Sequence, residues 1–63
     1  MKVAAFCWYV RRGDTYRVIV DSVIPDGKVR WVVFRRLLCC GGTGKRMAVG
    51  HSIFVRRFKE ATP

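Results

Sequence analysis

Acidic residues are scarce in this chain: four Asp and Glu stand against 13 Lys and Arg among 63 residues, which leaves a net charge of +9. A small domain with this charge repels itself unless a polyanion or salt neutralises it. The imbalance therefore indicates a partner with negative charge, which is nucleic acid, another acidic macromolecule or a membrane surface.

Long hydrophobic runs are also absent. The longest, Val3 to Val10, has eight residues, whereas a membrane helix needs roughly 20. It also lacks the small-residue cleavage site of a signal peptide. We therefore predict a cytoplasmic protein with no membrane partner.

The chain is short, so we expect one domain over residues 1–63 and no deep catalytic cleft, because a chain near 60 residues buries only about 60% of its unfolded surface. Apolar residues nevertheless make up 51% of the sequence and aromatics 13%. This is too apolar for a disordered basic tail, so the charge belongs to a folded domain.

Cysteine is limited to Cys7, Cys39 and Cys40, an odd number that does not fit a disulfide framework. No Cys-x-x-Cys spacing is present, and adjacent cysteines in a strand point to opposite faces. A zinc site with His51 is therefore not expected. We predict buried, reduced thiols and no metal.

Catalytic motifs are missing as well. The loop GGTGKR resembles a phosphate-binding loop, but Cys39 replaces its first Gly and Arg46 replaces its hydroxyl residue. Its backbone N–H groups remain candidates to hold a nucleic-acid phosphate. Asp14 and Asp26 occur in sequences typical of turns, and Asp21 is expected in an exposed salt bridge. We predict no enzyme and no cofactor.

Alternation of apolar and polar side chains predicts β-strands over residues 2–10, 15–22, 29–37 and 47–49. Pro25 presets φ, Asp26 favours a turn and Gly27 permits positive φ, so the segment up to Lys28 predicts a β-hairpin. The Gly-rich loop before residue 47 separates this hairpin from the last of these strands.

The strand over residues 29–37 has apolar side chains on both faces. We expect Trp31 and Val33 to pack against one layer and Val32 and Phe34 against another, as in a small barrel whose strands curl between two sheets. Most large aromatics are needed in the core of such a barrel. Only one of Trp8 and Trp31 is therefore expected to be half exposed.

Near the C-terminus, Ser52 is a candidate cap for a short helix or 3₁₀ turn. Phe54 and Phe58 are four residues apart and so lie on one face of this turn, whereas the neighbouring basic residues point outward.

Several segments together resemble those of short bacterial, phage and mobile-element proteins of unknown function: residues 13–18, Gly27, residues 32–34 and the stretch from Phe54 to Phe58. The resemblance covers residues 9–58, and the insertion from Cys39 to Lys45 departs from it. It implies a small SH3-like β domain. The predicted fold is accordingly all-β, an SH3-like or OB-like barrel of about five short strands with a C-terminal helical turn.

Basic residues occur as four adjacent pairs at the boundaries of the expected elements. With so few acids to neutralise them, we predict that they gather on one face and bind DNA or RNA with little sequence selectivity. The predicted phosphate contacts are Arg11, Arg12, Arg35, Arg36, Lys45, Arg46, Arg56 and Arg57. Trp8 and Trp31 are candidates for base stacking.

Two alternatives fit the same composition. The chain is also typical of a small mobile-element interaction module, an inhibitor or adaptor that docks on an acidic partner protein through its Gly-rich loop or a sheet edge. The second alternative is a homo-oligomer, since one copy of the chain has only a thin core.

Overall fold

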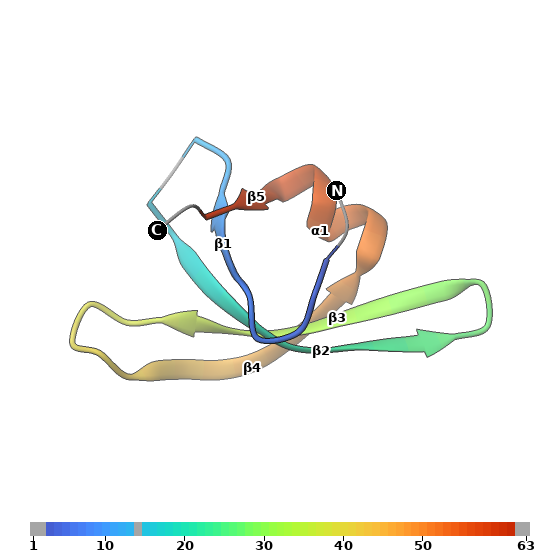
Figure 1. The fold of residues 1–63 in the computed structure, drawn as a ribbon, viewed down its shortest axis with the longest axis horizontal. Coiled ribbons are helices and arrows are strands. Elements are labelled where there is room, and N and C mark those ends of the chain that lie inside the picture. The colour runs from blue at the N-terminus through green and yellow to red at the C-terminus, as the bar shows by residue number, and fades with distance from the viewer. Residues whose placement is uncertain (1–2, 14, 62–63) are drawn as a thin grey trace.

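The computed structural model describes residues 3–13 and 15–61. Within them the chain forms one antiparallel sheet and one short helix, so the prediction of an all-β fold is confirmed (Figure 1). The elements are β1 (Trp8–Arg11), β2 (Arg17–Asp26), β3 (Val29–Leu37), β4 (Thr43–Gly50), α1 (His51–Arg57) and β5 (Phe58–Glu60).

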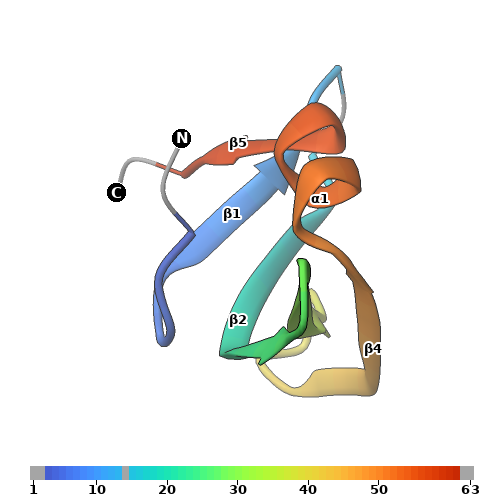
Figure 2. The same cartoon turned by 90° about the vertical axis from the view of Figure 1, so that its right-hand side faces the viewer.

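The sheet is open, in the order β4-β3-β2-β1-β5, so β4 and β5 form its two edges. Strand β2 pairs with β3 along most of its length and with β1 through its first residues. A register shift between Val20 and Ser22 marks a β-bulge, which bends a strand and increases its twist. The sheet consequently curls, and α1 lies between the two edges (Figure 2).

The core fills the side of the sheet that faces α1. Tyr9 pairs with Val18 and Val20 pairs with Phe34, so these side chains share that face. The buried set is Val3, Tyr9, Val18, Val20, Val32, Phe34, Phe54 and Phe58.

An aromatic cluster centres on Phe54, which is fully buried. Its ring stacks on Phe58 at 4.6 Å and meets Tyr9 edge-on at 5.2 Å. Phe34 lies 5.5 Å from Phe54 and 5.6 Å from Phe58. The expected common face of Phe54 and Phe58 is confirmed, although Phe58 already belongs to β5.

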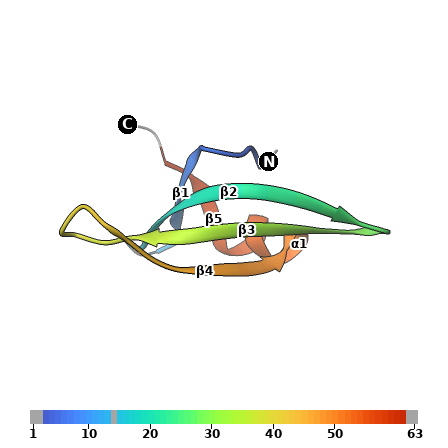
Figure 3. The same cartoon turned by 90° about the horizontal axis from the view of Figure 1, so that it is seen from below.

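The predicted hairpin is present, with β3 at the expected bounds and a turn at Gly27, whose φ is +60°. This hairpin extends well beyond α1 (Figure 3). Several boundaries differ from the prediction: β2 spans Arg17–Asp26 and not residues 15–22, and the helical turn is followed by an additional strand, β5. The first strand begins only at Trp8, because Phe6 has a φ of +63° that interrupts extended backbone. Strand β4 begins at Thr43 and not at Met47. The N-cap of α1 is Gly50, without a side-chain hydrogen bond, so Ser52 is not the cap.

Among residues 3–13 and 15–61, no second layer lies over the opposite face of the sheet, which corrects the prediction for Trp31 and Val33. Only Val32 and Phe34 of that strand are buried, whereas Trp31 is 40% exposed. Trp8 is 51% exposed, so both tryptophans and not one reach solvent. A single sheet with one helix buries only one of its faces. Here α1 covers the face that carries Val32 and Phe34.

The prediction of buried thiols is wrong, because all three cysteines are exposed. Cys39 and Cys40 lie in the turn that joins β3 to β4, and Cys7 lies just before β1. Neither segment is covered by another element of the described chain.

Candidate anion-binding cleft

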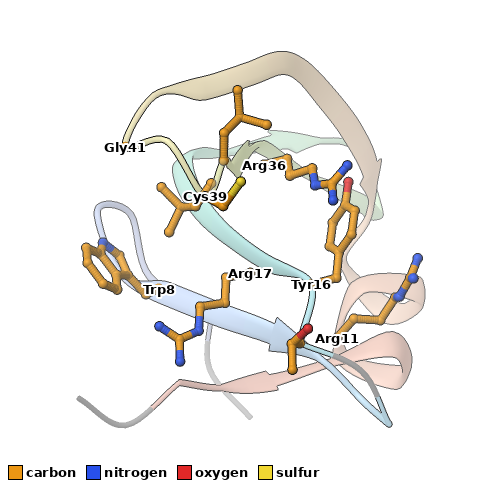
Figure 4. Close-up of a pocket in the computed structure, with 10 residues that line it drawn as sticks. Trp8, Arg11, Tyr16, Arg17, Arg36, Cys39 and Gly41 are labelled. Carbon is orange, nitrogen blue, oxygen red and sulfur yellow. The ribbon is translucent and has the colours of Figure 1, made fainter.

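A cleft of about 690 Å³ opens where β2 and β3 part (Figure 4). The two strands pair as far as Val18 and Arg36. Beyond that point the chain before β2 turns towards β1, while β3 runs on to Leu37 and its turn. The residues along this divergence, Trp8, Arg11, Tyr16, Arg17, Arg36 and Cys39 among them, line the cleft.

Tyr16 organises the cationic half of the cleft. The Cζ atom of Arg11 lies 4.6 Å from the centroid of its ring, and that of Arg36 lies 4.7 Å from it. Both distances are within the cation–π range of about 6 Å. Figure 4 shows Tyr16 between the two arginines, which come from β1 and β3. The ring, itself 6.4 Å from Phe58, thus anchors two guanidinium groups to the core.

Trp8 and Arg17 supply the other half. Trp8 pairs with Ile19 and Arg17 pairs with Val10, so the side chains of Trp8 and Arg17 project from the same face of β1 and β2. Figure 4 shows both beside the cleft, with Cys39 and Gly41 of the β3–β4 turn on its far side. An exposed indole therefore lies next to a guanidinium group.

The charge of the cleft is positive. Among the described residues, none that line it is acidic, whereas Arg11, Arg17 and Arg36 come from three different strands. Asp14 lies outside the described residues. Guanidinium groups along a hollow are suited to bind phosphate, since each presents several N–H donors in a planar fork.

Of the predicted phosphate contacts, Arg35 and Arg46 do not line the cleft, because both are paired with Asp21. An Nη atom of Arg35 lies 2.9 Å from Asp21 Oδ1, and Arg46 Nε lies 3.3 Å from Oδ2. The predicted salt bridge of Asp21 is therefore present, with two arginines and a largely buried carboxylate. Arg35 and Arg36 are separated in this way because adjacent strand residues point to opposite faces.

Three further predicted contacts lie at the end of α1. Arg56 and Arg57 occupy its last turn, where positive charge complements the helix dipole. The backbone N–H of Arg12 donates to the carbonyl of Arg57 at 2.8 Å, and its guanidinium donates to the carbonyl of Val55 at 3.4 Å. Since Arg12 follows Arg11 directly, this basic group adjoins the cleft.

The remaining predicted residues lie elsewhere. Lys45 is exposed on the edge strand β4, and Trp31 lies on the uncovered face opposite Gly50. The predicted residues thus do not share one face.

Sequence reasoning missed Tyr16 and Arg17, the residues that complete the cleft. In the sequence they are an aromatic next to a single arginine, directly after the turn before β2. Because both residues fit the regular alternation of a strand, nothing distinguishes them as part of a site.

In the described part of the chain, no group of three or more His, Cys, Asp or Glu side chains is placed to hold a metal ion. The described residues also form no helix long and apolar enough to cross a bilayer. No family model, curated protein or solved structure matches this chain.

Proposed function

We propose that this protein is a non-enzymatic nucleic-acid-binding protein whose principal contact is the arginine and aromatic cleft. The observation that carries the proposal is that Arg11, Arg17 and Arg36 all line one hollow together with Trp8 and Tyr16. Phosphate groups would bind the guanidinium groups, while the apolar wall would accept bases or sugars.

The basic end of α1 extends this contact surface. Arg12 follows the cleft residue Arg11 and is hydrogen-bonded to the end of α1, which carries Arg56 and Arg57. A strand of nucleic acid that leaves the cleft on this side therefore meets further positive charge. Contacts of this kind attract a polyanion of any sequence, because phosphates carry no sequence information.

The fold fits the same proposal. We propose that the open, curled sheet is a variant of the SH3-like barrel, supported by its meander of strands, its long bent β2 and the helical turn between β4 and β5. In this view the exposed end of the sheet, where β2 and β3 part, provides the ligand surface.

A salt titration tests the function. We expect a labelled oligonucleotide to bind in fluorescence anisotropy with log K falling linearly against log salt, at a slope near −3 to −5 for about five phosphate contacts. Arg17→Ala should make the slope shallower by about 0.7 to 0.9, the value of one lost phosphate contact.

Arg46→Ala is the matched control, since it removes the same charge from a residue that is paired with Asp21 and does not line the cleft. It should leave the slope within error of the parent protein. A flat salt response would overturn nucleic-acid binding. Equal losses in the two variants would show that net charge, and not the cleft, determines affinity. If instead a partner captured from lysate survives nuclease treatment while oligonucleotides do not bind, an acidic protein is the ligand.

A further inference from the structure

We infer that the cleft accepts an unpaired nucleotide, with its base stacked on Trp8 and its phosphate held by Arg17, so that the protein prefers single-stranded nucleic acid to duplex. This inference rests on the proposed function and specifies the form of the ligand.

Trp8 is the available stacking platform. Half of its surface is exposed (51%) at the rim of a positively charged hollow, which is where single-strand-binding proteins place aromatic rings. Tyr16, the other aromatic of the cleft, already has the guanidinium groups of Arg11 and Arg36 over its ring. A base therefore finds a free face on Trp8 and not on Tyr16.

The cleft also separates the two kinds of contact that a nucleotide requires. Trp8 is flanked across the cleft by the turn that carries Leu38, Cys39 and Gly41, whereas Arg11, Tyr16 and Arg36 lie together at its other end (Figure 4). Arg17 lies between these two regions in the same view. This arrangement offers an apolar slot for a base beside a cationic site for its phosphate.

Geometry disfavours a duplex at this site. In a double helix each base is stacked on its neighbours and paired across the axis, so its faces are not free to contact an indole. The cleft has a volume of about 690 Å³, within the range of about 300–1,000 Å³ typical of small-ligand sites, and is suited to one inserted nucleotide. A duplex would reach only the arginines at the rim.

The test compares three ligands of equal length in anisotropy titrations at fixed salt: a single strand, an abasic single strand with the same phosphates, and a duplex. We expect the single strand to bind most tightly. Trp8→Ala should weaken its binding by about 5- to 150-fold, the range that stacking of one base supplies. The same variant should change binding of the abasic strand and the duplex by less than about twofold.

Trp31→Ala is the matched control, because Trp31 is also half exposed (40%) but does not line the cleft. It should leave all three affinities unchanged. A second measurement needs no change at Trp8: in Trp31→Phe, the only tryptophan is Trp8, whose fluorescence should be quenched by the single strand and not by the duplex or the abasic strand.

The outcomes separate the inference from the function on which it rests. If duplex and single strand bind equally, with a dependence on Arg17 but none on Trp8, the inference is wrong and nucleic-acid binding stands. If no ligand binds with a dependence on salt, both fail. If the Trp8→Ala protein does not fold, the fluorescence of Trp8 in the Trp31→Phe protein decides between these outcomes.

Discussion

Replacing Phe54 by alanine should remove most of the stability of this protein. Phe54 is fully buried, and its ring contacts Tyr9, Phe34 and Phe58 at centroid distances of 5.2, 5.5 and 4.6 Å. Truncation of a buried Phe to Ala costs about 3–5 kcal/mol. A chain of 63 residues has a free energy of unfolding of only about 3–9 kcal/mol, so at the middle of both ranges Phe54→Ala loses about two thirds of it.

The matched control is Ile53→Ala on the same helix, where the side chain is 43% exposed. Ile and Phe have similar helix propensities, so the two variants gain similarly from alanine and differ in burial. Ile53→Ala should change the free energy of unfolding by less than about 1 kcal/mol, as exposed sites usually do. Phe54→Leu keeps much of the apolar volume and should lose about 1–2 kcal/mol through the missing ring contacts.

Urea denaturation followed by circular dichroism and tryptophan fluorescence measures all three variants, since m is about 1–3 kcal/mol per molar urea for small proteins. We expect the urea midpoint to be highest for Ile53→Ala, lower for Phe54→Leu and lowest for Phe54→Ala. A midpoint for Phe54→Ala equal to that of Ile53→Ala would refute the placement of Phe54 at the centre of the core.

Two further predictions concern titration and charge pairing. Partial burial, and then the nearby guanidinium of Arg30, lowers the pKa of His51 below 6.5. The folded protein therefore binds this proton less readily than the unfolded chain, and the free energy of unfolding should fall as pH drops through 6.5; His51→Gln should flatten this dependence, and an unchanged pH profile would contradict it. Asp21→Asn removes the ion pairs to Arg35 and Arg46, so urea denaturation should show a loss of about 1 kcal/mol; a tenfold gain in oligonucleotide affinity would instead place those arginines in the binding surface.

The sequence alone determined the local elements whose signals are short in range. Pro25, Asp26 and Gly27 specify a hairpin turn, and the β-branched run after it specifies β3 at its observed bounds. The four-residue spacing of Phe54 and Phe58 likewise gave their common face. These features depend on backbone preference and side-chain period, which neighbouring residues set.

The sequence also showed that the chain is basic and all-β, but not which basic residues meet. Arg35 and Arg36 look equivalent as a pair, yet one is bound to Asp21 and the other lies over Tyr16. Strand alternation puts them on opposite faces, and the register of β2 against β1 and β3, with its bulge between Val20 and Ser22, sets which residues each of them meets. Neither the bulge nor the register has a distinct local signal.

Tertiary structure alone created the cleft and exposed the thiols. The cleft exists because β2 leaves β3 to pair with β1, which brings Tyr16 and Arg17 to Trp8 and Arg36. Cys39 and Cys40 are exposed because their turn projects past the last paired residues of the sheet. Period and propensity specify how a segment folds on itself, whereas contacts between distant segments are set by strand pairing, and that is decided only when the whole chain is packed.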